Sequence, residues 1–354
     1  MAYQGTALWR EPEGPCLRNF NEGKAVDSVN GALALRPQIE QIVDQLWEEG
    51  FDGIWYMGIG GTWASALQAE VYLRGKTALP VYAENAAEFL TTGNRRFTSR
   101  SVLVYSSVSG NTKEMVELVD KVKALGARVV AFIDTPGSAL TQPGKWDYLI
   151  CYPQNEQLKF YMVANYLLYK NGEFPDYDQY NREMEAHLAQ DLADIEKECD
   201  AWAYDYAKKK AAFAKEHPDL PHYFIGAGNQ YGATYSYAMC YWEEQLWLRT
   251  KSISCGEFFH GMQEIIVADT PVTLFLGEDE LPGAVFAPPP VHPAVLPAVR
   301  LLRFIIKTSQ KRPGHGPGLL LWRQTAVTGE TPAASFAGTA LRQGRGDAFF
   351  PKSS

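Results

Sequence analysis

The sequence has little that could hold a metal ion or a disulfide framework. Its five cysteines are an odd number, are scattered over 354 residues and show no C-x-x-C spacing. None of the six histidines lies three or four residues from another, so no pair is placed to share a metal ion on one helix face. We therefore expect no metal centre, and cysteines that stay reduced, as in the cytoplasm.

Long apolar runs and blocks of positive charge are also missing. No stretch approaches the roughly 18 apolar residues that span a bilayer, and the N-terminal sequence Met-Ala-Tyr-Gln-Gly-Thr does not resemble a secretory signal. The formal net charge is -8, which argues against nucleic acid or an anionic membrane as a partner. What is present, 46% hydrophobic and 13% aromatic residues, predicts a globular protein with ample core.

The first half of the chain predicts an α/β domain. Short apolar runs without alternation are separated by segments with helical spacing, which is typical of a parallel sheet covered on both faces, the doubly wound arrangement. A glycine-rich loop, 58–62, follows the first of these runs directly. The expected strands are 54–57, 80–82, 101–105, 128–133 and 146–152, and the expected helices are 36–49, 64–73 and 113–125. The segment 84–90 lies between the second and third strands.

The second half of the chain repeats the pattern of a strand, a glycine-rich loop and a helix. A strand at 223–225 precedes a second glycine loop, 226–232, and a helix over 233–248, so we expect a duplicated α/β domain. The intervening segment is rich in helix formers and has no strand candidate. The predicted organisation is an N-terminal helical segment (1–50), a first domain (51–153), a helical connector (154–218), an incomplete second domain (219–280) and an atypical tail (281–354).

The tail differs sharply in composition. It holds 10 of the 21 prolines, nine basic against two acidic residues, and none of the 19 tyrosines. Residues 296–307 are its best helical candidate, and most of the rest is expected to be irregular. One hypothesis is a shifted reading frame after Glu280, and the alternative is a genuine tail that packs as a domain-swapped arm.

One loop predicts an anion site. Between the strand 101–105 and the helix 113–125, the stretch 106–112 brings hydroxyls of Ser107, Ser109 and Thr112 and the backbone around Gly110 to a helix N-terminus. The spacing of a nucleotide P-loop is absent, which favours a small phosphorylated metabolite. The alternative is a serine-rich helix cap without a ligand.

Candidate proton-transfer groups lie in the second half. Glu243, Glu244 and His260 could supply a general base and a general acid; alternatively, the glutamates form a solvated helix face and the histidine caps a turn. The first glycine loop only loosely resembles a dinucleotide fingerprint, because its third glycine position is Trp63. A nicotinamide cofactor is therefore not expected.

Together these motifs resemble the sugar isomerase (SIS) family of phosphosugar-binding proteins. The resemblance covers about residues 36–280 and is greatest to the fructosamine-6-phosphate deglycases. The matching motifs are Gly60-Gly61-Thr62, Ala87-Glu88-Phe89, Ser107-Val-Ser109-Gly110-Asn111-Thr112, Gly228-Asn229-Gln230-Tyr231 and Gly256-Glu257-x-x-His260-Gly261.

The resemblance implies roles for these residues. Gly60, Gly61, Thr62, Glu88 and the stretch Ser107 to Thr112, with Ser109, Gly110 and Asn111, would bind the phosphosugar. Gln230, Tyr231 and Glu257 would act in support. The family's catalytic glutamate lies sixteen residues before the histidine, which selects Glu244 with His260.

The implied reaction cleaves a fructosamine 6-phosphate to glucose 6-phosphate and an amine. It needs no cofactor and takes place in a homodimer or larger assembly, because the family's histidine commonly reaches a neighbouring subunit. The alternatives are an aldose–ketose isomerase of a sugar phosphate and a non-catalytic phosphosugar sensor.

Overall fold

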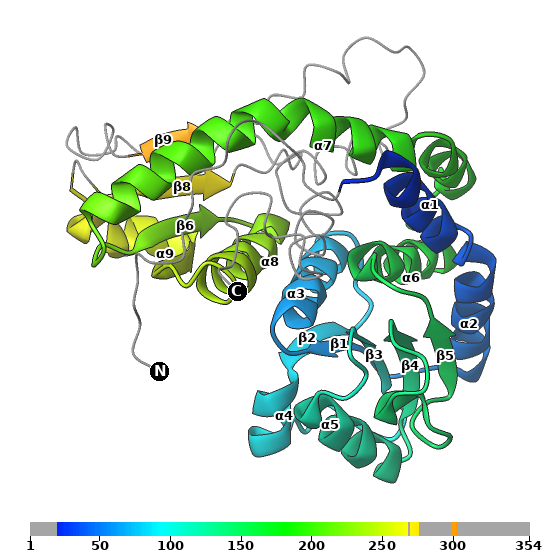
Figure 1. The fold of residues 1–354 in the computed structure, drawn as a ribbon. Coiled ribbons are helices and arrows are strands. Elements are labelled where there is room, and N and C mark those ends of the chain that lie inside the picture. Colours follow the sequence, from blue (N-terminus) through cyan, green and yellow to red (C-terminus); the bar gives the residue numbers. More distant parts are fainter. Residues whose placement is uncertain (1–19, 268–269, 276–298, 303–354) are drawn as a thin grey trace. The chain divides into compact units, whose positions relative to one another are not determined.

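The structure is a computed structural model, and it describes residues 20–267, 270–275 and 299–302 (Figure 1). The chain divides into two compact units. One unit comprises residues 27–186, and the other combines residues 1–26 with 187–354. Among the described residues, no helix has the length and apolar character that a membrane crossing requires.

The unit of residues 27–186 is built on a five-stranded parallel sheet in the order β2-β1-β3-β4-β5. Neighbouring strands are in regular register, with Ile54 of β1 opposite both Val81 of β2 and Val102 of β3. These strands are largely buried, which explains their unbroken apolar sequences. The strands are β1 (Ile54–Gly58), β2 (Val81–Asn85), β3 (Val102–Ser107), β4 (Arg128–Ile133) and β5 (Tyr148–Cys151).

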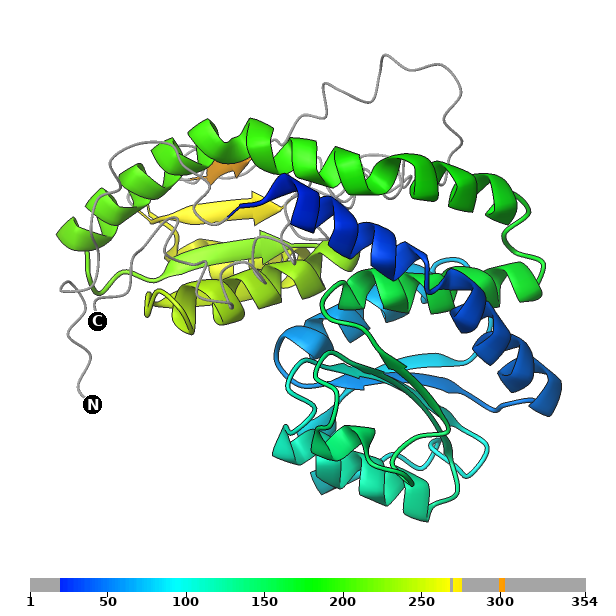
Figure 2. The same cartoon turned by 45° about the vertical axis from the view of Figure 1, so that its right-hand side comes forward.

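Helices cover both faces of this sheet, as Figure 2 shows. Trp55 and Met57 pack into the core beneath α4 and α5, whereas Tyr56 and Phe132 meet Phe160 of α6 on the opposite face. The alternation follows from the two-residue period of a strand. The helices are α1 (Glu22–Leu33), α2 (Arg36–Glu49), α3 (Gly61–Arg74), α4 (Ala86–Thr92), α5 (Lys113–Ala124) and α6 (Glu156–Lys170).

The other unit contains a second parallel sheet, in the order β7-β6-β8-β9. Phe224 of β6 packs with Trp242 and Tyr237 on one face, and Ile225 packs with Phe258 on the other. Its elements are the last part of α7 (Tyr177–Glu216), β6 (His222–Gly226), α8 (Asn229–Ser236), a π-helical segment η2 (Tyr237–Glu243), β7 (Thr250–Ser254), α9 (Cys255–His260), the turn η3 (Met262–Ile265), β8 (Val272–Phe275) and β9 (Val299–Leu302).

The two sheets share a chain order and a loop geometry. In both sheets the first strand along the chain lies between the second and the third, and the fourth lies beside the third: the orders are β2-β1-β3-β4 and β7-β6-β8-β9. Gly60 (φ 63°, ψ -133°) and Gly228 (φ 56°, ψ -134°) lie at matching places after β1 and β6. Both conformations are accessible mainly to glycine. This likeness supports the expected duplication, although the tandem arrangement of two SIS-type domains stays a prediction.

The prediction of an α/β fold with parallel sheets is confirmed. The prediction of one continuous helix over 233–248 is wrong, because α8 gives way to the π-helical segment and then to a turn. The helical candidate at 296–307 is also wrong for its described part, since Val299–Leu302 pair with β8 as a strand. The rest of the tail lies outside the described residues.

Candidate functional site

The carboxyl ends of β1 and β3 mark the topological switch point of the first sheet. The chain leaves β1 for β2 on one side, and the later strands β3, β4 and β5 extend on the other. Loops at such a point diverge and leave room for a ligand, which is why doubly wound proteins bind ligands there. The loop at Gly60 follows β1 and the Ser107–Thr112 loop follows β3, so the structure brings two sequence-predicted motifs to adjacent strand ends.

The Ser107–Thr112 loop folds into a cradle ahead of α5. The buried Ser107 hydroxyl accepts a hydrogen bond from the Gly110 N–H at 3.1 Å, and the Ser109 and Thr112 hydroxyls lie 3.4 Å apart. Thr112 is the N-cap of α5, but its side chain makes no capping hydrogen bond. The helix therefore presents N–H groups that its cap residue leaves unpaired, a typical arrangement for binding an anion.

Gly110 fits this loop in a way that no other residue could. Its φ is 63°, and a Cβ added there would stand 1.9 Å from the Ser138 Oγ. The left-handed backbone and the close approach both require glycine.

The segment that follows β4, residues 134–140, forms a clasp that holds the Ser107–Thr112 loop through hydrogen bonds. Asp134 N–H donates to the Ser107 carbonyl at 3.1 Å and Leu140 N–H donates to the Gly110 carbonyl at 3.0 Å. Thr135 Oγ1 donates to the Val108 carbonyl at 2.7 Å. These contacts fix the shape of the cradle. Sequence reasoning missed this segment, although its Thr-Pro-Gly-Ser turn directly after a predicted strand was a signal that it borders the same sheet edge.

The Asn111 side chain connects the cradle to the clasp and to its own loop. Its Oδ1 accepts the Ala139 N–H at 2.9 Å, and its Nδ2 donates to the Ser109 carbonyl at 3.0 Å. The loop positions Ser109 and Thr112 near the surface, with Ser109 exposed. Of the predicted side chains, the hydroxyls are thus better placed for a ligand than the Asn111 amide.

Thr62 stabilises the loop after β1 through hydrogen bonds to Ile59. The buried Thr62 Oγ1 donates to the Ile59 carbonyl at 3.1 Å and accepts the Ile59 N–H at 3.2 Å. Gly60 is the N-cap of α3 and has no side chain to cap the helix. Gly60 and Gly61 therefore offer backbone at a second helix N-terminus, while the Thr62 hydroxyl holds the loop.

Glu88 and Glu257 occupy matching places in the two units. Glu88 lies in the first turn of α4, which Asn85 caps through hydrogen bonds from the N–H groups of Ala87 and Glu88. Glu257 lies in the first turn of α9. Both carboxylates are exposed, and the phenylalanine that follows each of them is buried. Each thus stands at the carboxyl end of the second strand of its unit.

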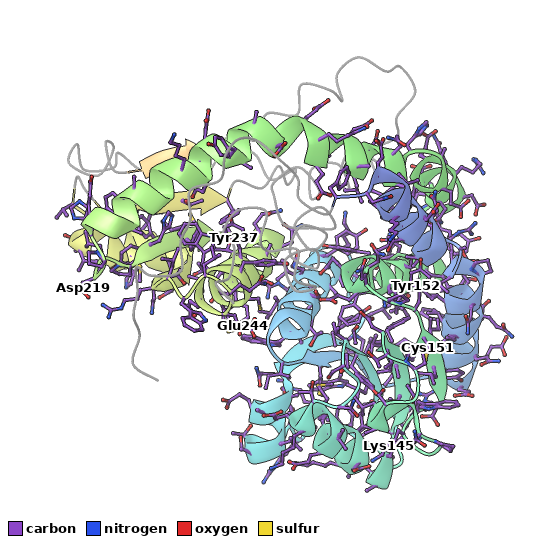
Figure 3. The ribbon with its side chains drawn as sticks, in the orientation of Figure 1. Lys145, Cys151, Tyr152, Asp219, Tyr237 and Glu244 are labelled. Atoms are coloured by element: carbon purple, nitrogen blue, oxygen red, sulfur yellow. The ribbon has the colours of Figure 1, made fainter. Side chains whose placement is uncertain are left out.

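Glu244 directly follows the π-helical segment, and Figure 3 labels it there together with Tyr237. Its N–H donates to the Met239 carbonyl at 2.9 Å, the five-residue step of a π-helix. The neighbouring Glu243 behaves differently, because its Oε1 accepts the Thr250 hydroxyl at 2.5 Å. Glu243 is therefore tied to the first residue of β7, and Glu244 is exposed.

Glu244 and His260 belong to segments that adjoin opposite ends of β7. Glu243 contacts the beginning of β7, whereas His260 ends the short helix α9 that follows the end of β7. The five residues of β7 span about 16 Å.

Gln230 and Tyr231 lie at the start of α8, at the carboxyl end of β6. Gln230 is buried, and its Oε1 has no hydrogen-bond partner among the described residues. Tyr231 is half-buried. Because Gly228 matches Gly60, Gln230 has the place in the second unit that Thr62 has in the first.

Comparison with known proteins identifies the first unit. The family model for the SIS domain matches residues 52–168. Over these residues the chain is similar to the SIS domain family. The matched range contains the cradle, the glycine loop of β1 and most of α6. The resemblance drawn from the sequence motifs is thereby confirmed.

Two curated proteins with similar sequences are named as deglycases. The fructosamine deglycase FrlB of Bacillus subtilis (strain 168) is 26% identical over 258 residues, which cover 69% of this chain and 74% of that protein. The fructoselysine 6-phosphate deglycase of Escherichia coli O157:H7 is 23% identical over 247 residues, which cover 69% and 71%.

Solved structures share the fold of this chain. The C-terminal domain of glucosamine-fructose-6-phosphate aminotransferase from Francisella tularensis matches with a TM-score of 0.58 and 15% identity. The match covers 73% of this chain and 75% of that one.

Within the described ranges, no group of three or more His, Cys, Asp or Glu side chains is placed to hold a metal ion.

Proposed function

We propose that this chain is a phosphosugar enzyme that cleaves a fructosamine 6-phosphate to glucose 6-phosphate and a free amine. The observation that carries the proposal is the hydroxyl-lined cradle at the uncapped start of α5, inside an SIS domain. The curated relatives named as deglycases support the reaction class.

The phosphate of the substrate occupies the cradle in this proposal. The hydroxyls of Ser107, Ser109 and Thr112 and the first N–H groups of α5 supply hydrogen bonds to its oxygens. Gly110 keeps the loop narrow, and the clasp after β4 holds it in place. Gly60, Gly61, Thr62 and Glu88 border the sugar, from the neighbouring strand ends.

The chemistry is a proton transfer followed by hydrolysis. Glu244 removes a proton from C1, which is acidified by the C2 carbonyl, and gives an enaminol. His260 acts as the acid at the O2 or C2 end. Return of a proton to C2 leaves an imine between C1 and nitrogen. Addition of water, activated by Glu244, breaks the C1–N bond and releases the amine.

The position of His260 favours a second copy of the chain as the source of this group. Glu243, the neighbour of Glu244, contacts the first residue of β7, and α9 with His260 follows the last residue of β7, which favours two chains as the source of the two groups. We therefore propose a homodimer, with Glu257, Gln230 and Tyr231 in support. The second unit is in this proposal a second SIS-type domain.

The adjacent glutamates provide a matched test. Glu244→Gln is expected to lower release of glucose 6-phosphate from a fructosamine 6-phosphate by at least about a hundredfold, because the base is lost. Glu243→Gln removes a carboxylate one residue away and is expected to keep the activity within a fewfold. A coupled glucose-6-phosphate assay measures both. Equal activities of the two variants would contradict the assignment of Glu244.

A further inference from the structure

Lys159 is a buried cation that the proposed reaction does not use. Its side chain lies in α6 and is 0% exposed. The Nζ atom donates to the Tyr152 carbonyl at 2.9 Å, lies 3.4 Å from Asp134 Oδ1 and is 5.8 Å from the centre of the Phe132 ring. A well-packed apolar residue is often at least as stabilising in such a place as a buried ion pair. Stability alone therefore does not explain why a lysine lies here.

Asp134 connects this cation to the phosphate cradle. Its side chain is 7% exposed and faces Lys159, while its backbone N–H donates to the Ser107 carbonyl at 3.1 Å. The hydroxyl of Ser107 in turn accepts the Gly110 N–H at 3.1 Å. One residue thus pairs with the buried cation through its side chain and holds the first residue of the cradle through its backbone.

The same carboxylate holds a turn of unusual backbone conformation between β5 and α6. Asp134 Oδ2 accepts the Gln154 N–H at 2.8 Å. Gln154 and Asn155 are consecutive residues with φ of 64° and 56°, values that residues other than glycine seldom adopt. Such backbone persists only where surrounding contacts hold it, and it is concentrated at functional sites. Here contacts come from Asp134 and, through the Tyr152 carbonyl, from Lys159.

We propose that Lys159 is a positioning residue for the phosphate cradle and acts through Asp134. This role rests on the proposed function, in which the cradle binds the phosphate of the substrate. The cation keeps the Asp134 carboxylate inside the fold, where its oxygen holds the turn and its backbone holds Ser107. Without the cation, a buried carboxylate would turn toward water, and the clasp would loosen.

The role predicts an effect on binding rather than on chemistry. A cradle that is already held in its binding geometry loses less entropy when the phosphate enters. The proposed chemical groups, Glu244 and His260, belong to the other unit of the chain. Loss of Lys159 should therefore weaken phosphate binding and leave the chemical step unchanged.

Arg128 provides a matched control at the opposite end of the same strand. It begins β4, whereas Asp134 directly follows the end of β4. Its guanidinium lies 2.7 Å from Glu49 Oε2 and donates to the Gly50 carbonyl at 2.6 Å. Lys159→Met and Arg128→Met each remove a cation that anchors one end of β4, and both are expected to lower the melting temperature. Only Lys159→Met removes the cation beside the clasp.

Calorimetric titration with glucose 6-phosphate, well below the melting temperature of every variant, tests the proposal. The dissociation constant is expected to rise about tenfold in Lys159→Met and to stay within about twofold in Arg128→Met. The double variant Lys159→Met/Asp134→Asn should bind within about threefold of the wild type, because an amide oxygen accepts the Gln154 N–H without needing a cation. Unchanged binding in Lys159→Met, equal losses in the two single variants, or no recovery in the double variant overturns the proposal.

Turnover gives a readout that reduced stability would not produce. With a fructosamine 6-phosphate, Lys159→Met is expected to raise KM about tenfold and to keep kcat within about twofold, the pattern of lost ground-state binding. A fall in kcat at unchanged KM overturns the proposal.

Hydrogen exchange separates this proposal from the proposed function. If the wild type neither binds glucose 6-phosphate nor releases it from a fructosamine 6-phosphate, the phosphate site of the proposed function fails. Exchange over residues 134–140 then still decides whether Lys159 holds the clasp, because it is expected to be faster in Lys159→Met than in Arg128→Met. Equal exchange in the two variants overturns that role.

Discussion

At the scale of single residues, the cradle depends on glycine backbone as much as on hydroxyl groups. Gly110 allows the loop to turn and lets Ser138 approach the backbone closely. The hydroxyls of Ser107 and Ser109 are held by hydrogen bonds from the N–H groups of Gly110 and Asn111. A change in this backbone should therefore disturb the whole cradle.

We expect Gly110→Ala to destabilise the chain and to weaken phosphate binding. The added methyl group meets Ser138 at an impossible distance, and overpacking of this kind costs about 1–3 kcal/mol. Gly93→Ala is a matched control, because Gly93 also has a positive φ (66°) but no atom within 4 Å of an added Cβ. Denaturant unfolding and titration with glucose 6-phosphate compare the two. Equal losses in both variants would show that only the backbone conformation matters.

At the scale of elements, a buried ion pair joins α6 to the end of β4. Lys159 has a fully buried side chain; its Nζ donates to the Tyr152 carbonyl at 2.9 Å and lies 3.4 Å from Asp134 Oδ1. The other Asp134 oxygen accepts the Gln154 N–H at 2.8 Å. Because Asp134 also begins the clasp on the cradle, this pair connects three elements at the candidate site.

We expect Lys159→Met to lower the free energy of unfolding by about 3–5 kcal/mol, because it leaves the Asp134 carboxylate buried without its cation. The double variant Lys159→Met/Asp134→Asn should recover much of this loss. Denaturant unfolding of the single and double variants measures the difference. If both were equally unstable, the pair would contribute by packing rather than by charge.

The same pair predicts a dependence on pH. Burial lowers the pKa of Lys159, so at alkaline pH the unfolded chain binds more protons there than the folded chain does. The contribution of this group to stability therefore rises with pH until the unfolded lysine also loses its proton, near pH 10.4. The double variant should lack this rise.

Much of this element structure could be predicted from the sequence. Apolar runs fixed the strands of the first sheet, and helical spacing gave α2 at its observed bounds, Arg36–Glu49. The end of the 233–248 helix could not be predicted, because the π-helical register and the left-handed Trp247 depend on local packing that no periodicity records. Likewise β9 forms by pairing with β8, a contact distant in sequence.

Only part of the candidate site could be predicted, because some of its contacts join segments that are distant in sequence. The cradle is one continuous motif, so its residues could be found from their order alone. The clasp was missed because its hydrogen bonds, from Thr135 to Val108 and from Ala139 to Asn111, form only when β3 and β4 pair. That the segments of Glu244 and His260 adjoin opposite ends of β7 also could not be predicted, because a spacing of sixteen residues does not say at which end of a strand each residue lies.

At the scale of the whole molecule, the proposed homodimer makes a quantitative prediction. If each site takes Glu244 from one chain and His260 from its partner, two inactive variants complement each other. Co-expressed Glu244→Gln and His260→Ala chains should recover about a quarter of wild-type activity, because half of the randomly formed dimers contain one intact site. Each variant expressed alone controls for residual activity. No recovery despite mixed dimers would place both residues in one chain.

The most direct test of the proposed reaction is product analysis with the wild-type chain. The purified protein is incubated with a fructosamine 6-phosphate, and glucose 6-phosphate and free amine are quantified together. We predict that the two products appear in a one-to-one ratio. Interconversion of free sugar phosphates without release of amine, or binding of the phosphosugar without any product, would contradict the account.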